Sequence, residues 1–161
     1  MASMHTDNHK LWYALYSLEI AYWHDVDRNG GRSAHEFYVP DGVMVVGHNR
    51  FEGRDDIRKF YEWREQQGKT SVTGTTTTRH LLNNLSIESS TERSANVIGI
   101  VSFYGGVARR MSQPKPPILM TDLVSECVLD DDGRWRYKSH ILEPVFASHE
   151  SPLSLAIAAR R

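Results

Sequence analysis

The sequence has little cysteine and no long apolar run. Cys127 is its only cysteine, so an internal disulfide and a cysteine-based zinc site are both excluded. No apolar run reaches the roughly 18 residues of a membrane-spanning helix. The polar N-terminus, MASMHTDNHK, lacks the charged and then apolar pattern of a signal peptide. We therefore expect a protein of a reducing, cytoplasmic compartment that does not bind membranes.

Strong charge and several catalytic motifs are also missing. The formal net charge is −1, which argues against a nucleic-acid binder because such proteins usually carry a basic stripe. The sequence contains no G-x-S-x-G, Walker loop, dinucleotide fingerprint or H-E-x-x-H. Elbow-type serine hydrolases, P-loop enzymes and zincins therefore receive no support. A small molecule or another protein is the expected partner.

What is present fits one globular domain. The chain has 161 residues, of which 40% are hydrophobic and 24% charged, close to ordinary globular values. A chain of this length buries about 70% of its unfolded surface, which leaves room for a core with a pocket. We expect a single domain over residues 1–161, with its core at about 9–147. The tail 152–161 is expected to be a short helix or a mobile arm that covers a pocket mouth.

Helical spacing predicts a helix over residues 7–25, ended by Asn29-Gly30-Gly31. This helix has two apolar stripes. The first contains Leu11, Leu15, Leu18 and Tyr22, and the second contains Trp12, Tyr16, Ile20 and Trp23. A helix that is apolar on two sides either is buried on both or has the core on one side and a cavity on the other. Both alternatives remain open.

The remaining elements divide into a helical first half and a β-rich second half. A short helix is expected over 33–38, stopped by Pro40, then a strand over 43–46 and a hairpin turn over 47–50. A second amphipathic helix covers 54–67, and its apolar face can be extended to Arg64. Strands are expected over 75–87, 96–104, 118–129 and 135–146, with a loop over 105–117 and a tight turn over 130–133.

This order of elements predicts an α+β fold. Helices come first and long strands follow, so a strongly curved, antiparallel or mixed sheet wraps around the N-terminal helices. The resulting conical barrel would enclose a pocket, which is a common place for a ligand.

His80 and Asp27 are the first candidates for chemistry. Alternation along the strand places His80 on one face with four neighbours: Thr76, Thr78, Leu82 and Asn84. Asp27 follows Trp23 by one helical turn, whereas Asp25 continues the leucine stripe. A carboxylate at the pocket wall needs a partner, and His80 is the obvious one. Such a pair would fix the imidazole tautomer and strengthen the base. A surface histidine and an aspartate that only ends the helix remain alternatives.

The same segment matches a calcium-loop pattern. Asp25-Val-Asp27-Arg-Asn29-Gly30, followed by Glu36, fits D-x-[DN]-x-[DN]-G-x5-E. Arg32 stands where such loops carry an aliphatic residue, Pro40 follows the exit helix too soon, and no second copy exists. We therefore expect no bound metal.

Two further polar residues lie in the predicted strands of the second half. His140 shares a face with Lys138 and Leu142 by alternation and could add a polar group to the pocket. Asp122 is a lone acid in an apolar strand, and both an exposed position and a pocket position remain open.

Four segments make the chain resemble a known superfamily. They are Val26-Asp27-Arg28 at a helix end, Phe51-Glu52-Gly53 before a helix, a T-x-H-x-x-x-N strand over 78–84, and Gly133-Arg134-Trp135-Arg136-Tyr137. Together they resemble the nuclear transport factor 2-like superfamily over roughly residues 11–146. The likeness is to its SnoaL-like branch, which includes scytalone dehydratase and the lindane dehydrochlorinase.

The resemblance implies a function as well as a fold. It matches Asp27 and His80 to an Asp–His dyad that acts as a base in a cofactor-independent lyase or isomerase. It adds a polar position near Asp122, a cavity-lining His140, and dimers or trimers formed through the convex sheet face. The expected substrate is small, mostly apolar and cyclic, with further contacts from Tyr16, Trp23 and Asn84. The alternative is a non-catalytic binding protein or the β-type subunit of a ring-hydroxylating dioxygenase.

Overall fold

The computed structural model describes residues 3–70, 76–107 and 114–148. Its helical elements are α1 (Ser3–Arg28), the 3-10 helix η1 (Ala34–Phe37) and α2 (Gly53–Thr70). Its strands are β1 (Tyr38–Val46), β2 (Asn49–Glu52), β3 (Thr76–Ser90), β4 (Ser94–Val107), β5 (Leu119–Leu129) and β6 (Trp135–Ala147). The three helices and five strands that the sequence predicts are present, most of them longer than expected, and β2 follows the predicted hairpin turn.

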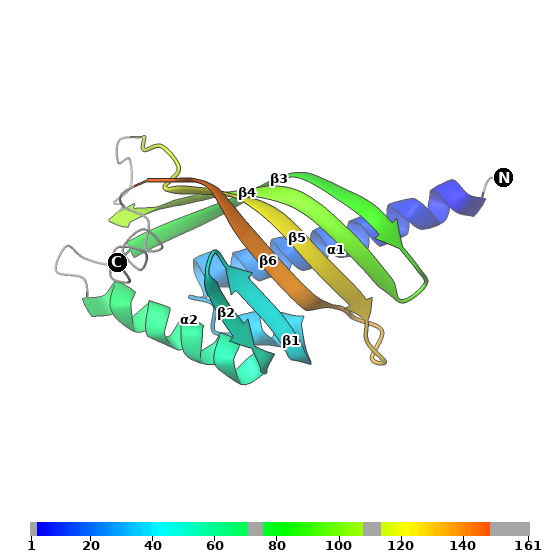
Figure 1. Ribbon diagram of the computed structural model, residues 1–161, viewed down its shortest axis with the longest axis horizontal. Coiled ribbons are helices and arrows are strands. Elements are labelled where there is room, and N and C mark those ends of the chain that lie inside the picture. Colours follow the sequence, from blue (N-terminus) through cyan, green and yellow to red (C-terminus); the bar gives the residue numbers. More distant parts are fainter. Residues whose placement is uncertain (1–2, 71–75, 108–113, 149–161) are drawn as a thin grey trace.

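The six strands form one mixed sheet in the order β2-β1-β6-β5-β4-β3. The pair β1 and β6 is parallel, and the other pairs are antiparallel. Figure 1 shows the long strands β3 to β6 curving over α1, with α2 beside β1 and β2. This arrangement confirms the predicted α+β cone. It leaves β3 as an edge strand that packs beside α1.

The two stripes of α1 have different environments. Leu15, Leu18 and Tyr22 are buried against the sheet, as expected for the first stripe. In the second stripe only Trp23 is buried, at 4% exposed, whereas Trp12 and Tyr16 stay accessible at 40% and 36%. The second stripe therefore does not line one continuous cavity. No helix in the described ranges is long and apolar enough to cross a membrane.

Several boundaries differ from the prediction for identifiable reasons. Strand β1 begins at Tyr38 and contains Pro40, because its register with β6 is interrupted between Tyr38 and Val43, where a missing N–H breaks no ladder bond. Strand β4 continues to Val107, so the start of the predicted loop is strand. Residues 108–113 of that loop and the tail 152–161 lie outside the described residues.

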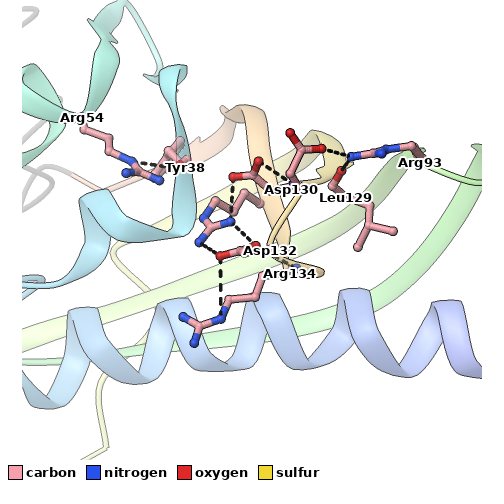
Figure 2. Close-up of polar contacts among 9 residues, drawn as sticks. Tyr38, Arg54, Arg93, Leu129, Asp130, Asp132 and Arg134 are labelled. Atoms are coloured by element: carbon pink, nitrogen blue, oxygen red, sulfur yellow. Dashed lines mark hydrogen bonds and ion pairs between the residues drawn. The ribbon is translucent and has the colours of Figure 1, made fainter.

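The turn between β5 and β6 is held by ion pairs. Gly133 has a φ of 78°, which a glycine adopts without strain. The Arg136 guanidinium donates to Asp130 at 2.7 Å and to Asp132 at 2.6 Å, and Arg93 on the neighbouring turn reaches the Leu129 carbonyl at 3.0 Å. Figure 2 shows Asp130, Asp132, Leu129 and Arg93 gathered around this turn. The predicted tight turn is confirmed.

Helix α2 is tied to β1 at its first turn. Arg54 Nε donates to the Tyr38 carbonyl oxygen at 2.8 Å (Figure 2). The apolar face of the helix then buries Ile57 and Tyr61, and Phe60 packs on Phe51 with ring centroids 4.5 Å apart. This packing fixes which residues of α2 face the interior. Arg64 follows Tyr61 by three positions and therefore lies on the same face of the helix.

Candidate functional site

The last turn of α1 places Asp27 opposite β3. Asp25 holds this helix end, because its carboxylate accepts hydrogen bonds from Asn29 Nδ2 at 2.7 Å and from the Ser33 backbone N–H at 3.1 Å. Gly31 has a φ of 77° and turns the chain away from the helix. Asp25 and Asp27 therefore bind different partners, and no cluster of three metal-ligating side chains occurs in the described ranges.

Asp27 contacts His80 in two ways. Its Oδ1 lies 2.7 Å from His80 Nδ1, and its Oδ2 accepts the His80 backbone N–H at 2.7 Å. The Thr78 hydroxyl also donates to Oδ1, at 2.9 Å. Since β3 is an edge strand, its outward N–H needs an acceptor, and the carboxylate supplies one. The predicted contact between Asp27 and His80 is confirmed.

The imidazole of His80 lies between two aromatic rings. The Trp23 ring stacks on one face with centroids 4.3 Å apart and an interplanar angle of 17°. The Phe103 ring stacks on the other face at 4.6 Å and 18°, because Phe103 pairs with His80 across the β3–β4 ladder. The side chain is 9% exposed. The two rings hold the imidazole in one plane, so that only its edges can reach other groups.

The two edges of this imidazole differ. An ionised carboxylate can only accept, so the proton of neutral His80 is on Nδ1, toward Asp27. Nε2, at the opposite edge, has no hydrogen-bond partner among the described residues. The ring therefore presents a lone pair away from Asp27.

The surroundings set the ionisation of both groups. Burial is the main cause that lowers the pKa of His80 from 6.5 to about 4, and the charge of Arg64 acts in the same direction. The hydrogen bond that His80 donates to Asp27 raises this pKa but does not outweigh burial. For Asp27, burial tends to raise the pKa. The hydrogen bonds and charge of His80, together with Thr78, outweigh it and hold that pKa below its usual range. At neutral pH the pair is therefore a carboxylate beside a neutral imidazole.

This shift predicts how stability depends on pH. The free energy of unfolding should fall as the pH drops from 6.5 to about 4, because the unfolded chain protonates His80 first. The loss is about 3 kcal/mol at the standard conversion of a pKa shift, and urea unfolding at a series of pH values measures it. The His80→Gln variant has no imidazole and should lack this part of the dependence. An identical dependence in the variant would contradict the assigned shift.

His140 belongs to a second, fully buried polar group. Its Nδ1 lies 3.1 Å from the Tyr38 hydroxyl and its Nε2 lies 3.4 Å from Glu19 Oε2, and Ser125 Oγ donates to the other Glu19 oxygen at 3.2 Å. Its ring centroid is 5.6 Å from that of Trp23. His140 thus points inward, as the resemblance implied, but lies behind Trp23 rather than beside His80.

Lys138 does not share the inward face with His140. The β5–β6 register shifts between Glu126 and Cys127, opposite Lys138, and the bulge reverses the alternation there. Lys138 instead forms an ion pair with Asp41 at 2.7 Å.

Asn84 also departs from the predicted pattern. It has a φ of 52°, and the β3–β4 register shifts between Asn83 and Ser86. This bulge changes the parity of the strand, so Leu82 and then Leu85 pack on the core while Asn84 is exposed. The prediction that Asn84 lies on the face of His80 is wrong.

Asp122 and Tyr16 have no contact with Asp27 or His80 among the described residues. On β5, Thr121 and Leu123 are buried, so Asp122 points to the opposite, exposed face. Of its two predicted positions, the exposed one is correct. Tyr16 is accessible and stacks on Trp12 with centroids 4.9 Å apart. Neither residue joins Asp27 and His80.

The sequence did not indicate the roles of three residues around the site. Glu19 follows Leu15 by four positions and so falls within the buried stripe, a signal that could have identified it. Phe103 could have been found only from the β3–β4 register. Arg64 was recognised as an extension of the apolar face of α2, but nothing in the sequence indicated its relation to His80.

Comparison by sequence finds nothing, whereas comparison by structure does. No family model matches the chain, and no curated protein matches it. A protein of Novosphingobium aromaticivorans, provisionally named a scytalone dehydratase, is 23% identical, with 91% of this chain and 92% of that chain covered and a TM-score of 0.71. A provisionally named β subunit of an aromatic-ring-hydroxylating dioxygenase from the same organism is 13% identical, with coverage of 91% and 96% and a TM-score of 0.72.

A third structure contains a small molecule. It is a protein of Catenulispora acidiphila in complex with S-DNPA, 16% identical, with 93% of this chain and 98% of that chain covered and a TM-score of 0.68. At these identities the likenesses show a shared fold, the curved sheet over a long helix.

Proposed function

We propose that this chain, which has the nuclear transport factor 2-like, SnoaL-like fold, is a cofactor-independent lyase or isomerase with His80 as its general base. One observation carries the proposal. His80 is hydrogen-bonded to Asp27 through Nδ1 at 2.7 Å, and its Nε2 has no partner among the described residues. An oriented, neutral imidazole with a free lone pair is the arrangement that general base catalysis requires.

The reaction begins with proton abstraction from carbon. His80 Nε2 takes a proton from a carbon next to an activating group, and the electron pair of the C–H bond moves into that group. Asp27 stabilises the imidazolium that forms, as an aspartate does beside a catalytic histidine. The electron pair then either expels a leaving group, which takes the proton from the imidazolium, or forms a new C–H bond with that proton at another carbon. The first outcome is an elimination and the second an isomerisation.

The surroundings of His80 favour a small, mostly apolar, cyclic substrate. Trp23 and Phe103 are aromatic rings on either face of the base, so a group that reaches the free edge of the imidazole meets the edges of two apolar rings. In this proposal Trp23 contacts the substrate, whereas His140, which is fully buried, acts as a positioning residue from behind Trp23.

Hydrogen–deuterium exchange tests this function without knowledge of the leaving group. The protein is incubated in deuterium oxide with a panel of small cyclic ketones and β-hydroxy ketones, and nuclear magnetic resonance follows loss of the α-proton signal. We expect exchange above the buffer rate with at least one member, together with elimination or migration of the double bond. Exchange at the buffer rate throughout the panel would count against the proposal.

A second candidate is a scaffold rather than an enzyme. The likeness to a dioxygenase β subunit, at a TM-score of 0.72, favours a β-type subunit or a non-catalytic binder. Such a subunit should co-purify with an iron-containing α subunit, whereas the proposed enzyme should be active alone. The Asp27–His80 pair favours the enzyme, because a scaffold needs no oriented base.

A further inference from the structure

Arg64 is a half-buried cation on the interior side of α2. Its guanidinium carbon lies 5.9 Å from the Tyr61 ring centroid and 5.8 Å from that of Phe103. The second of these rings is the one that stacks on His80 at 4.6 Å. Arg64 is therefore one aromatic ring away from the base, and its charge acts on the imidazole.

Arg64 has no anionic partner, in contrast to other arginines of this region. Arg58, one and a half turns earlier on α2, pairs with Asp55 at 3.3 Å and with Glu62 at 2.9 Å. Arg32 pairs with Glu65 across the gap between η1 and α2. In the described ranges Arg64 has neither a carboxylate nor a carbonyl acceptor. A guanidinium has five N–H donors, and a partly buried one without an acceptor is open to an anion.

A second donor beside the base is also unpaired. Trp23 Nε1 is buried and has no hydrogen-bond partner among the described residues. An unsatisfied buried N–H costs about 1–3 kcal/mol, so this indole N–H would gain from a hydrogen bond to a ligand. Trp23, which stacks on His80, and Arg64, which lies against the Phe103 ring on His80, thus offer donors and a positive charge close to the base. The carboxylate of Asp27 is already occupied by His80 and Thr78.

We propose that Arg64 binds the substrate oxygen that becomes negatively charged when His80 removes the proton, which makes the substrate a carbonyl compound. This inference rests on the proposed function, which it narrows. When Nε2 takes the α-proton, the C–H electron pair forms a C=C bond and the carbonyl π pair moves onto oxygen. The resulting enolate oxygen lies against the guanidinium. A substrate without such an oxygen, such as a haloalkane, would leave Arg64 unpaired.

Binding of an enolate mimic tests the inference separately from turnover. The probe is para-nitrophenolate, used above the pKa of the phenol, and the neutral comparison is nitrobenzene, which has a similar shape. Affinities are measured by calorimetry for the wild type, Arg64→Gln, Arg64→Lys and Arg58→Gln. Arg58→Gln is the matched control, since it removes a cation from the same helix at an exposed, already paired position.

We expect the wild type to bind the phenolate more tightly than nitrobenzene. Arg64→Gln should weaken phenolate binding by about 10- to 100-fold, the usual size of a charge-assisted hydrogen bond, and should leave nitrobenzene binding within a few-fold. Arg64→Lys should retain part of the preference, and Arg58→Gln all of it. No preference in the wild type, or an unchanged preference in both Arg64 variants, would overturn the inference.

The His80→Gln variant separates this inference from the proposed function. It should lose α-proton exchange and keep phenolate binding, because the anion is held by Arg64. If wild-type protein exchanges no α-proton but binds phenolate through Arg64, the proposed chemistry fails while the anion site stands. If exchange depends on His80 but not on Arg64, the base stands and the anion site fails.

Discussion

His80→Ala is expected to slow α-proton exchange by about 10²- to 10⁴-fold, the contribution of a positioned general base. The variant removes the only lone pair that the stacked rings of Trp23 and Phe103 hold toward the substrate. It also leaves Asp27 with the Thr78 hydroxyl and the backbone N–H of residue 80 as hydrogen-bond donors. The exchange assay in deuterium oxide measures the effect, and circular dichroism checks that the fold is retained.

His48→Ala is the matched control for this variant. His48 is exposed in the turn between β1 and β2, so its loss should leave exchange within about twofold of wild type. Equal exchange in His80→Ala and wild type would contradict the base assignment. Equal loss in both histidine variants would mean that the assay reports stability rather than the base.

Asp27→Asn is expected to slow exchange almost as much, by about 10²- to 10⁴-fold, through the imidazole tautomer. An asparagine can still accept from the His80 backbone N–H through its carbonyl oxygen. Its amide nitrogen would then face His80 Nδ1 and donate to it. The imidazole proton would move to Nε2, so the base would lose its lone pair while the fold kept its contacts. The exchange rate measures the loss.

Asp41→Asn is the matched control for this variant. Asp41 is a surface residue that pairs with Lys138, and its replacement should leave exchange unchanged. The Asp27→Asn prediction fails if exchange stays at the wild-type rate, or if the His80 proton remains on Nδ1 while exchange is lost.

The low resting pKa of His80 needs explanation, since a base works best when its pKa is near the operating pH. The value of about 4 belongs to the free site, in which Asp27 favours the buried imidazolium whereas burial, Arg64 and His140 disfavour it. In the reaction the imidazolium forms together with an enolate, whose charge offsets part of the cost of burial. Arg64 then acts on both partners, because it disfavours the imidazolium and stabilises the enolate.

The sequence predicted the contact between Asp27 and His80 because two simple periodicities meet there. The phase of the α1 helix brings Asp27 one turn after Trp23, and strand alternation brings Thr78 and His80 to one face. Both periodicities persist up to these residues, so the contact forms as predicted. The resemblance selected Asp27 over Asp25, and the structure explains the choice, since Asp25 holds the helix end.

The failures lie where a periodicity is interrupted. Alternation predicted that Asn84 shares the face of His80, and a bulge in β3 breaks it. Alternation also predicted that Lys138 shares the face of His140, and a bulge in β6 breaks it. One inserted residue reverses inward and outward positions. The β6 bulge contains no glycine or proline that would reveal it, and the β3 bulge is marked only by Asn84 and by Gly99 on the facing strand. Arg64 was missed for a different reason, because its role depends on Phe103, a residue of another strand that only the folded register brings near.

Nitrogen-15 magnetic resonance of the His80 imidazole at neutral pH tests the central claim most directly. We predict a neutral ring whose proton is on Nδ1 and is hydrogen-bonded to Asp27. Its Nε2 should have the chemical shift of an unprotonated nitrogen. A proton on Nε2, or an imidazolium at neutral pH, would contradict it, because His80 would then have no lone pair to act as a base.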